Sequence, residues 1–221
     1  MDVLEAIRSR KSTRAYLDKP VARATVEAIL DAARWAPSGV NTQPWRVVVV
    51  TGATKEKIST DMLDAREARQ PENPDYTYYP AQWEEPYKSR RKASGLALYA
   101  ALKISKDDAF ARLKAWNNNY RFFGAPVGLL FFVDRALAQG SWVDMGMFIE
   151  NVMLAARAHG LDTCPQASLA EYPDIVRGIL NVPVTHALIC GMALGYGDTG
   201  AAANSYRTER EPVSAFTTWH D

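Results

Sequence analysis

The sequence predicts one α+β domain, or an α/β domain with a mixed sheet, over residues 1–221. Segments with helical spacing alternate with short apolar strands, but they follow no regular strand–helix–strand rhythm. A chain of 221 residues can bury one sizeable core. Hydrophobic residues at 48% and charged residues at 23% are the proportions of an ordinary globular protein, so the composition fits this class.

Three helices are expected in the first third of the chain. Asp2 can cap a short first helix. The inner face of this helix is expected to consist of three apolar residues, Val3, Leu4 and Ile7. A second helix is expected over residues 22–35, where apolar residues recur at helical spacing before Pro-Ser-Gly ends it. A third is expected at about residues 54–66.

Strands are expected from runs of apolar and β-branched residues. Residues 46–50 read Arg-Val-Val-Val-Val, which predicts a buried strand, and Gly52 ends it. Residues 125–133 are expected to form a central strand, and residues 186–194 a further one.

The second half of the chain predicts helices over residues 87–103, 142–158 and 170–180. Ser141 is expected to cap the second of these, and Gly160 ends it. Because this helix is apolar on most sides, it is expected to be buried all round, either in the core or at a subunit interface.

Residues 70–87 form an aromatic-rich excursion between predicted helices. Four prolines exclude a long helix there. Its aromatic residues argue against disorder, and they are Tyr76, Tyr78, Tyr79 and Trp83. A loop of this length is expected either to cover a site or to pack its aromatic side chains on its own domain.

The net charge and the N-terminal residues bear on which partners and which cellular location are expected. A net charge of +1 argues against a global attraction to nucleic acid or to a membrane. No apolar run reaches the roughly 20 residues of a membrane-spanning helix. The acidic first residues do not resemble a signal peptide, so a cytoplasmic location is expected.

Cysteine and histidine positions predict no metal site. Cys164 and Cys190 form no CxxC pair, and we expect two small core residues rather than a disulfide or a nucleophile. His159, His186 and His220 are scattered and have no partner at metal-ligand spacing.

Four patches carry groups suited to a cofactor. Residues 8–14 combine cations and hydroxyls that suit a phosphate, with a solvated basic face as the alternative. Residues 36–45 present amides and hydroxyls that suit the edge of a heterocycle, or form an ordinary polar turn. Residues 164–168 lie before a helix, where backbone N–H groups are free, or simply connect two elements. The fourth patch combines the glycine pair Gly195 and Gly197 with Arg207 and Arg210 a short distance later.

In this order, the four patches resemble the nitroreductase family of FMN enzymes over almost the whole chain. They are Arg10-Lys11-Ser12-Thr13-Arg14, Pro37-Ser38-Gly39-Val40-Asn41-Thr42-Gln43-Pro44-Trp45, Gly160-Leu161-Asp162 leading to Pro165, and Arg207 through Pro212. The family implies an α/β/α layered α+β fold with a central mixed, mainly antiparallel sheet. It also implies an intertwined homodimer with two FMN molecules between the subunits.

The resemblance assigns the cofactor-binding residues. The FMN phosphate would be held by Arg10, Lys11 and Ser12, completed by Arg207 or Arg210. Arg14 would lie near the pyrimidine end of the flavin, where a cation raises its potential. The residues contacting the same FMN from the other subunit would be Pro37, Ser38, Gly39 and Asn41, and Gln43 offers a further amide.

The flavin face would be lined by Pro165, Gln166, Ala167 and Ser168. The N–H of Ala167 or Ser168 would then lie near the reactive N5. Many relatives carry an acidic residue and then glycine at these last two positions, so the sequence departs from the family here and leaves the N5 contact open.

The family implies electron transfer from NADH or NADPH to a nitroaromatic acceptor by a ping-pong scheme. Anionic acceptors such as nitrobenzoates are candidates, because Arg90, Arg91 and Lys92 would favour them if they face the pocket. Residues 117–123 are a second candidate for the pocket wall. Water can supply protons, so no catalytic side chain is assigned. The alternatives are a quinone, flavin or enone reductase, and a non-catalytic flavin-binding protein.

Overall fold

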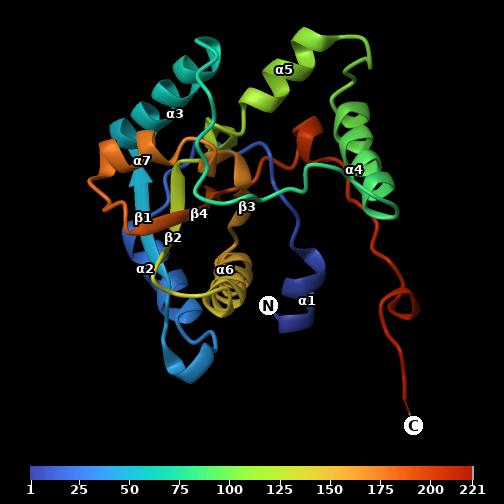
Figure 1. Cartoon of the computed structure of the whole chain (residues 1–221). Helices are drawn as coiled ribbons and strands as arrows, with labels where there is room; N and C mark the ends of the chain where they lie inside the picture. Colours follow the sequence, from blue (N-terminus) through green and yellow to red (C-terminus); the bar gives the residue numbers. More distant parts are fainter. Residues whose placement is uncertain (221) are drawn as a thin grey trace.

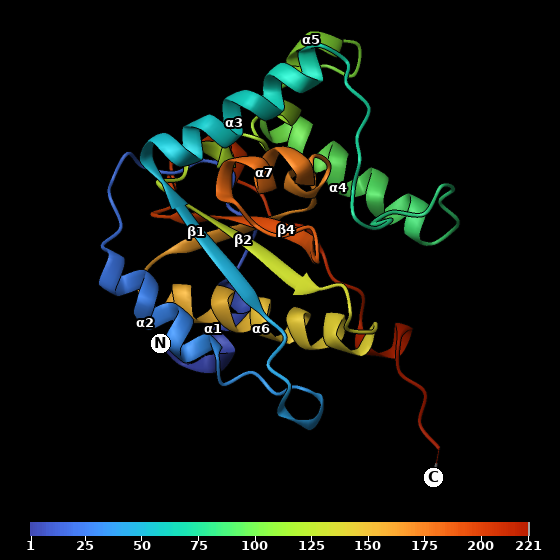
Figure 2. The same cartoon turned by 60° about the vertical axis from the view of Figure 1, so that its left-hand side comes forward.

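The computed structural model describes residues 1–220 and has three layers, with helices on both faces of one sheet (Figure 1 and Figure 2). Within these residues the seven α-helices are α1 (Val3–Ser9), α2 (Arg23–Ala33), α3 (Gly52–Glu67), α4 (Tyr87–Ala101), α5 (Ala109–Asn117), α6 (Gly140–Ala158) and α7 (Pro173–Leu180). The strands are β1 (Arg46–Thr51), β2 (Val127–Asp134), β3 (Asp162–Gln166) and β4 (His186–Gly195). The layered α+β class is therefore confirmed.

The strands form one sheet in the order β1-β2-β4-β3, and all three pairings are antiparallel. The expected mixed sheet is wrong for these strands. The parallel contact of the described chain is an isolated bridge between Ser12 and Thr163, outside any strand pairing. The residue pattern locates strands but not their direction. Two neighbouring strands are antiparallel when the connection stays at one end of the sheet and parallel when it crosses to the other end.

The predicted strand at residues 46–50 is present as β1, but it is not buried. β1 lies at one edge of the sheet, and Val50 is its buried residue, while Val49 is 42% exposed. A β-branched run predicts extended backbone because the side chains suit a pleated surface. It does not reveal whether a strand has neighbours on one side or on both.

Helices α1, α2 and α6 cover one face of the sheet (Figure 2). Val26 and Ile29 of α2 pack with Met145 and Phe148 of α6 in a shared core. α1 contacts α6 and buries only Ala6. The expected inner face of α1 is therefore wrong within a single chain, because its three larger apolar residues point outward; Val3, Leu4 and Ile7 are 61%, 52% and 47% exposed.

The long apolar helix α6 differs from its prediction in two ways. It begins at Gly140, and the N-cap position is Gln139, so Ser141 lies inside the first turn and does not cap it. It is buried on the side facing the sheet, whereas Val143 is 65% exposed. Burial all round is therefore not found within one chain.

Helices α3 and α7 cover the other face, where Ile58 and Met62 of α3 meet Val176 of α7. The central strand β2 serves both cores, because its side chains alternate: Leu129 faces the first core and Leu130 the second. α7 begins at Pro173, and the 3-10 turn η3 (Ala167–Ala170) occupies the start of the helix expected over residues 170–180.

Helices α4 and α5 project from this body and have no buried residues (Figure 1). α4 confirms the helix expected at residues 87–103, and no helix interrupts the described chain between Glu67 and Tyr87, as expected from its prolines. α5 was not predicted. Asp108 caps it, because its carboxylate accepts a hydrogen bond of 2.8 Å from the N–H of Ala111.

Both cysteines are buried free thiols, as predicted. Burial raises the pKa of Cys164 to about 11 and that of Cys190 to about 12. Within residues 1–220, no helix has the length and apolarity needed to cross a lipid bilayer.

Candidate functional site

The basic segment, residues 10–14, lies against the chain segment that follows β4. The ammonium group of Lys11 donates to the carbonyl oxygen of Asn204. The N–H of Arg14 donates to the side-chain oxygen of Asn204 at 2.7 Å, and its guanidinium donates to the Tyr206 hydroxyl at 3.0 Å. These contacts bring together residues about 190 positions apart and gather several cations in one place.

Asn204 connects the two segments, and the sequence did not single it out. The whole residue is only 4% exposed. Its side-chain amide donates at 2.8 Å to the carbonyl oxygens of Ala15 and Asp198. With the bond accepted from Arg14, all of these contacts are to backbone groups. The sequence holds no local signal for this role, because the burial of Asn204 depends entirely on contacts with distant residues.

The structure separates the two candidate arginines. The guanidinium of Arg207 donates to the carbonyl oxygen of Arg10 at 3.3 Å, so Arg207 lies at the basic segment. The guanidinium of Arg210 instead donates to Thr208 and to the carbonyl oxygen of Glu209, both beside it in sequence. Arg207 therefore joins the cationic group, and Arg210 does not.

The basic segment also lies along β3. Ser12 forms a bridge with Thr163, and the N–H of Thr13 donates to the carbonyl oxygen of Thr163 at 3.0 Å. β3 leads directly into the junction, residues 165–168, so the first and third sequence patches are neighbours. Pro165 is compatible with β3 because β3 is an edge strand of the sheet.

The junction packs closely against β4. A Cβ on Gly191 of β4 would lie only 2.1 Å from Cδ1 of Leu169, the residue after the junction, so this glycine allows η3 to approach the sheet. The side-chain amide of Gln166 donates to the carbonyl oxygen of Asn119 at 2.5 Å. Residues 117–123, the second candidate for a pocket wall, therefore adjoin the junction.

Three of the six unpaired buried polar atoms found within residues 1–220 lie on these same segments. They are the hydroxyl of Thr13, the amide oxygen of Gln166 and the hydroxyl of Ser168. A buried polar atom without a partner costs free energy, so such atoms need an explanation. A ligand with hydrogen-bonding ring atoms and an anionic tail would satisfy them and would match the cations nearby. The donor set therefore fits FMN.

The second patch forms a turn, residues 37–43, that packs on α6 and is conformationally strained. Val40, Asn41 and Gln43 have φ values of 44°, 59° and 49°, a region that non-glycine residues rarely occupy. The N–H of Gly39 donates to the carboxylate of Asp144 at 3.2 Å, and the N–H of Gln43 donates to the Ser38 hydroxyl at 3.0 Å.

The turn is separate from the basic segment. No hydrogen bond or ion pair joins the two within the part of the chain that the structure describes. Pro37, Gly39, Asn41 and Gln43 are exposed, and Ser38 is half-buried. One chain therefore brings together the first, third and fourth patches, but not the second.

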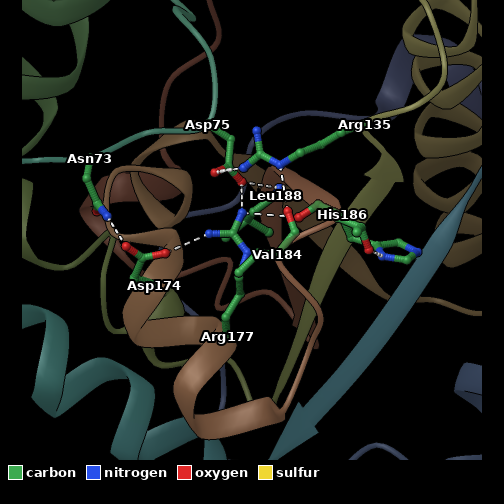
Figure 3. Close-up of polar contacts among 9 residues, drawn as sticks. Asn73, Asp75, Arg135, Asp174, Arg177, Val184, His186 and Leu188 are labelled. Atoms are coloured by element: carbon green, nitrogen blue, oxygen red, sulfur yellow. Dashed lines mark hydrogen bonds and ion pairs between the residues drawn. The ribbon is translucent and has the colours of Figure 1, made fainter.

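The aromatic excursion is attached to the body through Asp75 (Figure 3). The Asp75 side chain is 4% exposed and accepts hydrogen bonds from the guanidinium groups of Arg177 and Arg135. It also accepts a bond of 2.7 Å from the N–H of Leu188 in β4. We call Asp75, Arg135, Arg177 and the Leu188 N–H the Asp75 cluster.

The Asp75 cluster favours the charged carboxylate. Burial by itself would raise the pKa of Asp75, but the hydrogen bonds from Arg177 and Leu188 and the charges of Arg177 and Arg135 outweigh it. The pKa of Asp75 is therefore lower than that of an ordinary aspartate. Arg177 is itself 7% exposed and also pairs with Asp174 at 2.9 Å.

Tyr76 makes a second attachment. Its hydroxyl donates to the carbonyl oxygen of Ile189 at 2.5 Å, and its ring meets Trp142 of α6 edge to face with centroids 4.6 Å apart. The start of the excursion is thus held on both the sheet and α6. Farther along, Tyr78 and Tyr79 are exposed. The excursion therefore packs on its own domain at its start and presents exposed aromatic rings beyond, and its covering of a site stays a prediction.

Known proteins resemble this chain over nearly its whole length. The nitroreductase family matches residues 7–196. A 4-nitrobenzoate reductase from Pseudomonas putida is 38% identical, over 96% of this chain and 92% of that protein. A nitrobenzene nitroreductase from Ectopseudomonas oleovorans is 39% identical, over 97% and 95%. The crystal structure of an FMN and NADPH-dependent nitroreductase, NfnB from Sphigopyxis sp. strain HMH, has a TM-score of 0.96 at 38% identity and covers 100% of both chains.

Proposed function

Because this chain belongs to the nitroreductase family, we propose that it is an FMN-dependent enzyme that uses NAD(P)H to reduce nitroaromatic compounds. The observation that carries the proposal is the meeting of the basic segment, Arg207 and the junction in one place. This place offers cations for a phosphate beside unpaired polar atoms suited to a heterocycle. The NADPH dependence described for the Sphigopyxis relative favours NADPH as the donor.

In this proposal the basic segment holds the cofactor tail. Arg10, Lys11 and Arg207 neutralise the phosphate, and the Ser12 hydroxyl adds a directed donor. Arg10 lies 3.7 Å from Glu150, so that carboxylate orients the guanidinium and offsets part of the positive charge. Arg14, fixed by Tyr206, would lie at the pyrimidine end.

The junction would face the ring. When bound, FMN supplies the electron-transfer chemistry, since a flavin can be reduced by a nicotinamide and reoxidised by a second substrate. Gln166 and Ser168 are buried and retain unpaired oxygen atoms, so they can orient the ring and keep water from it. The N–H of Ala167 or Ser168 would donate to the ring edge. Because the two substrates use one site in turn, we expect ping-pong kinetics.

We further propose a homodimer in which the turn, residues 37–43, contacts the FMN held by the other subunit. The turn is exposed and separate from the basic segment of its own chain. Large apolar side chains are also exposed on α1, on α6 and near the C-terminus, where Phe216 is 71% and Trp219 is 82% exposed. The residues before the C-terminus run away from the body (Figure 1 and Figure 2). A partner subunit would bury these surfaces.

The visible spectrum of the purified protein tests the function. We expect a yellow protein that bleaches when NADPH is added without oxygen and regains its colour when nitrobenzene follows. A colourless protein that takes up no added FMN would overturn the proposal. Bound flavin that NADPH cannot bleach would instead indicate a non-catalytic flavin-binding protein.

Two matched variants test the phosphate assignment. Arg207→Ala should weaken FMN binding by at least about tenfold, the effect of losing one charge-assisted hydrogen bond to a phosphate. Arg210→Ala removes the same charge three residues later and should change FMN affinity by less than about twofold, because its guanidinium contacts only its own segment. Fluorescence titration of the apoprotein with FMN measures both. Equal losses would contradict the assignment of Arg207.

A further inference from the structure

The excursion carries a continuous row of aromatic rings. We define the aromatic row as Tyr76, Tyr78, Tyr79 and Trp83. Successive ring centroids lie 6.0, 4.5 and 5.6 Å apart, so each ring contacts the next. Tyr76, at one end, is fixed to β4 and α6. Trp83, at the other end, is half-buried. The row therefore has a fixed position relative to the body and offers flat apolar surfaces.

The aromatic row ends at a cation on α4. The guanidinium of Arg91 lies over the ring of Trp83, with its carbon 5.3 Å from the ring centroid. Burial raises the pKa of Tyr79, and the charge of Arg91 partly opposes this rise. This cation–π contact uses none of the N–H donors of Arg91, and among residues 1–220 none of them makes a hydrogen bond. Arg91 therefore offers a directed fork of donors beside the row.

Arg91 has no acidic partner, unlike the adjacent Arg90. Within residues 1–220 it makes no ion pair with a carboxylate. The adjacent Arg90 pairs with Glu211 at 3.0 Å. The nearest carboxylate upstream of α4, Glu85, is used otherwise, since it accepts a hydrogen bond of 3.2 Å from the N–H of Ser89. Lys92 likewise has no ion pair among residues 1–220, but Arg91 is the residue held against the aromatic row through Trp83.

The aromatic row also adjoins the proposed flavin site. Glu171 follows η3 directly, and its carbonyl oxygen accepts a hydrogen bond of 3.0 Å from the N–H of Asn73, so the start of the excursion lies against the segment that leaves the junction. α4 contacts the 3-10 turn η4 (Ala202–Asn204), whose last residue binds Arg14. The helix that carries Arg91 is therefore placed between the aromatic row and the basic segment.

We propose that Arg91 binds the carboxylate of an anionic nitroaromatic acceptor whose ring packs on Tyr79 and Trp83. This inference rests on the proposed function and names its substrate class, a nitrobenzoate. In 4-nitrobenzoate the carboxylate and the nitro group lie at opposite ends of one ring. Binding of the carboxylate at Arg91 would therefore orient the nitro group away from α4.

The test compares 4-nitrobenzoate with nitrobenzene, which has the same nitro group and no carboxylate. Arg91→Gln should lower kcat/KM for 4-nitrobenzoate by about tenfold, mainly through KM, and leave that for nitrobenzene within about twofold. Arg91→Lys should recover part of the loss, because it restores the charge without the planar fork. Lys92→Gln is the matched control, since it removes one charge from the next exposed residue of α4 and should affect neither acceptor.

The outcomes separate this inference from the proposed function. Equal effects of Arg91→Gln on both acceptors, or an equal effect of Lys92→Gln, would overturn the role of Arg91 while nitro reduction stands. If the unaltered protein reduces nitrobenzene but neither binds nor reduces 4-nitrobenzoate, the inference fails alone. If the unaltered protein with bound FMN reduces neither compound, both fail. Quenching of tryptophan fluorescence by 4-nitrobenzoate measures its binding without turnover.

Discussion

Asp75→Asn should lower the free energy of unfolding by about 3 kcal/mol, because it removes the charge at the centre of the Asp75 cluster. The substitution keeps the size of the side chain and its capacity to accept from the Leu188 N–H. It leaves the guanidinium of Arg177, which is 7% exposed, without its buried partner. The change therefore isolates the charge of Asp75 from its shape.

The magnitude follows from what each arginine retains. Breaking a buried ion pair by removing one partner costs roughly 3–5 kcal/mol. The lower end applies here, because Arg177 keeps Asp174 at 2.9 Å and a bond of 3.1 Å to the carbonyl oxygen of His186. Arg135 is 42% exposed and can turn to solvent, so its contribution is small.

Urea unfolding followed by tryptophan fluorescence, at one protein concentration, measures the loss. Asp174→Asn is the matched control, since it removes the other carboxylate of the same arginine. Asp174 is 67% exposed, so its loss should cost less than about 1 kcal/mol. If Asp75→Asn destabilises the protein no more than Asp174→Asn, then burial does not determine the strength of this pair and the reasoning is refuted.

Three further predictions concern pH, packing and cofactor retention. Because the pKa of Asp75 is lowered, its carboxylate stabilises the fold fully above the ordinary aspartate pKa of about 4, and this stabilisation disappears as pH falls through the lowered value. The urea midpoints of the unaltered protein and Asp75→Asn should therefore converge in acid. A constant difference between the two midpoints would contradict this. Gly191→Ala should cost about 2 kcal/mol, because the added Cβ would lie 2.1 Å from Leu169. Gly178→Ala in α7, with nothing within 4 Å, should instead stabilise the protein by up to about 1 kcal/mol in the same unfolding assay, because alanine is the better helix former. Asn204→Ala should release FMN about tenfold more readily by fluorescence, since three buried hydrogen bonds to the backbone are lost; unchanged release would remove Asn204 from the site.

Local patterns predicted the elements whose signal is contained in neighbouring residues. The strands β2 and β4 and the helices α2, α3 and α4 appear at or near their expected positions, because apolar spacing and turn residues determine such segments. α5 was missed, although Asp108 before an apolar-containing stretch is a helix-start signal. The exposed edge position of β1 and the outward face of α1 depend on neighbours that local spacing does not specify.

The candidate site divides in the same way. Residue type marked the basic segment and the turn as candidates but left a solvated face and an ordinary turn open, and the family resemblance supplied their expected role in binding FMN. The choice of Arg207 over Arg210 required the structure, since both lie in one segment with the same charge. Asp75 was not identified, because its partners are 102 and 113 positions away.

The strained turn at residues 37–43 is a surface region where a substitution that relieves backbone strain should stabilise the protein. A branched side chain at φ 44°, as for Val40, costs roughly 1–2 kcal/mol relative to glycine. Val40 is 97% exposed, so no packing within its own chain offsets that cost. A library selected only for heat resistance should therefore accumulate glycine at this position. The resulting variants would show whether rigidity of the turn is needed for turnover.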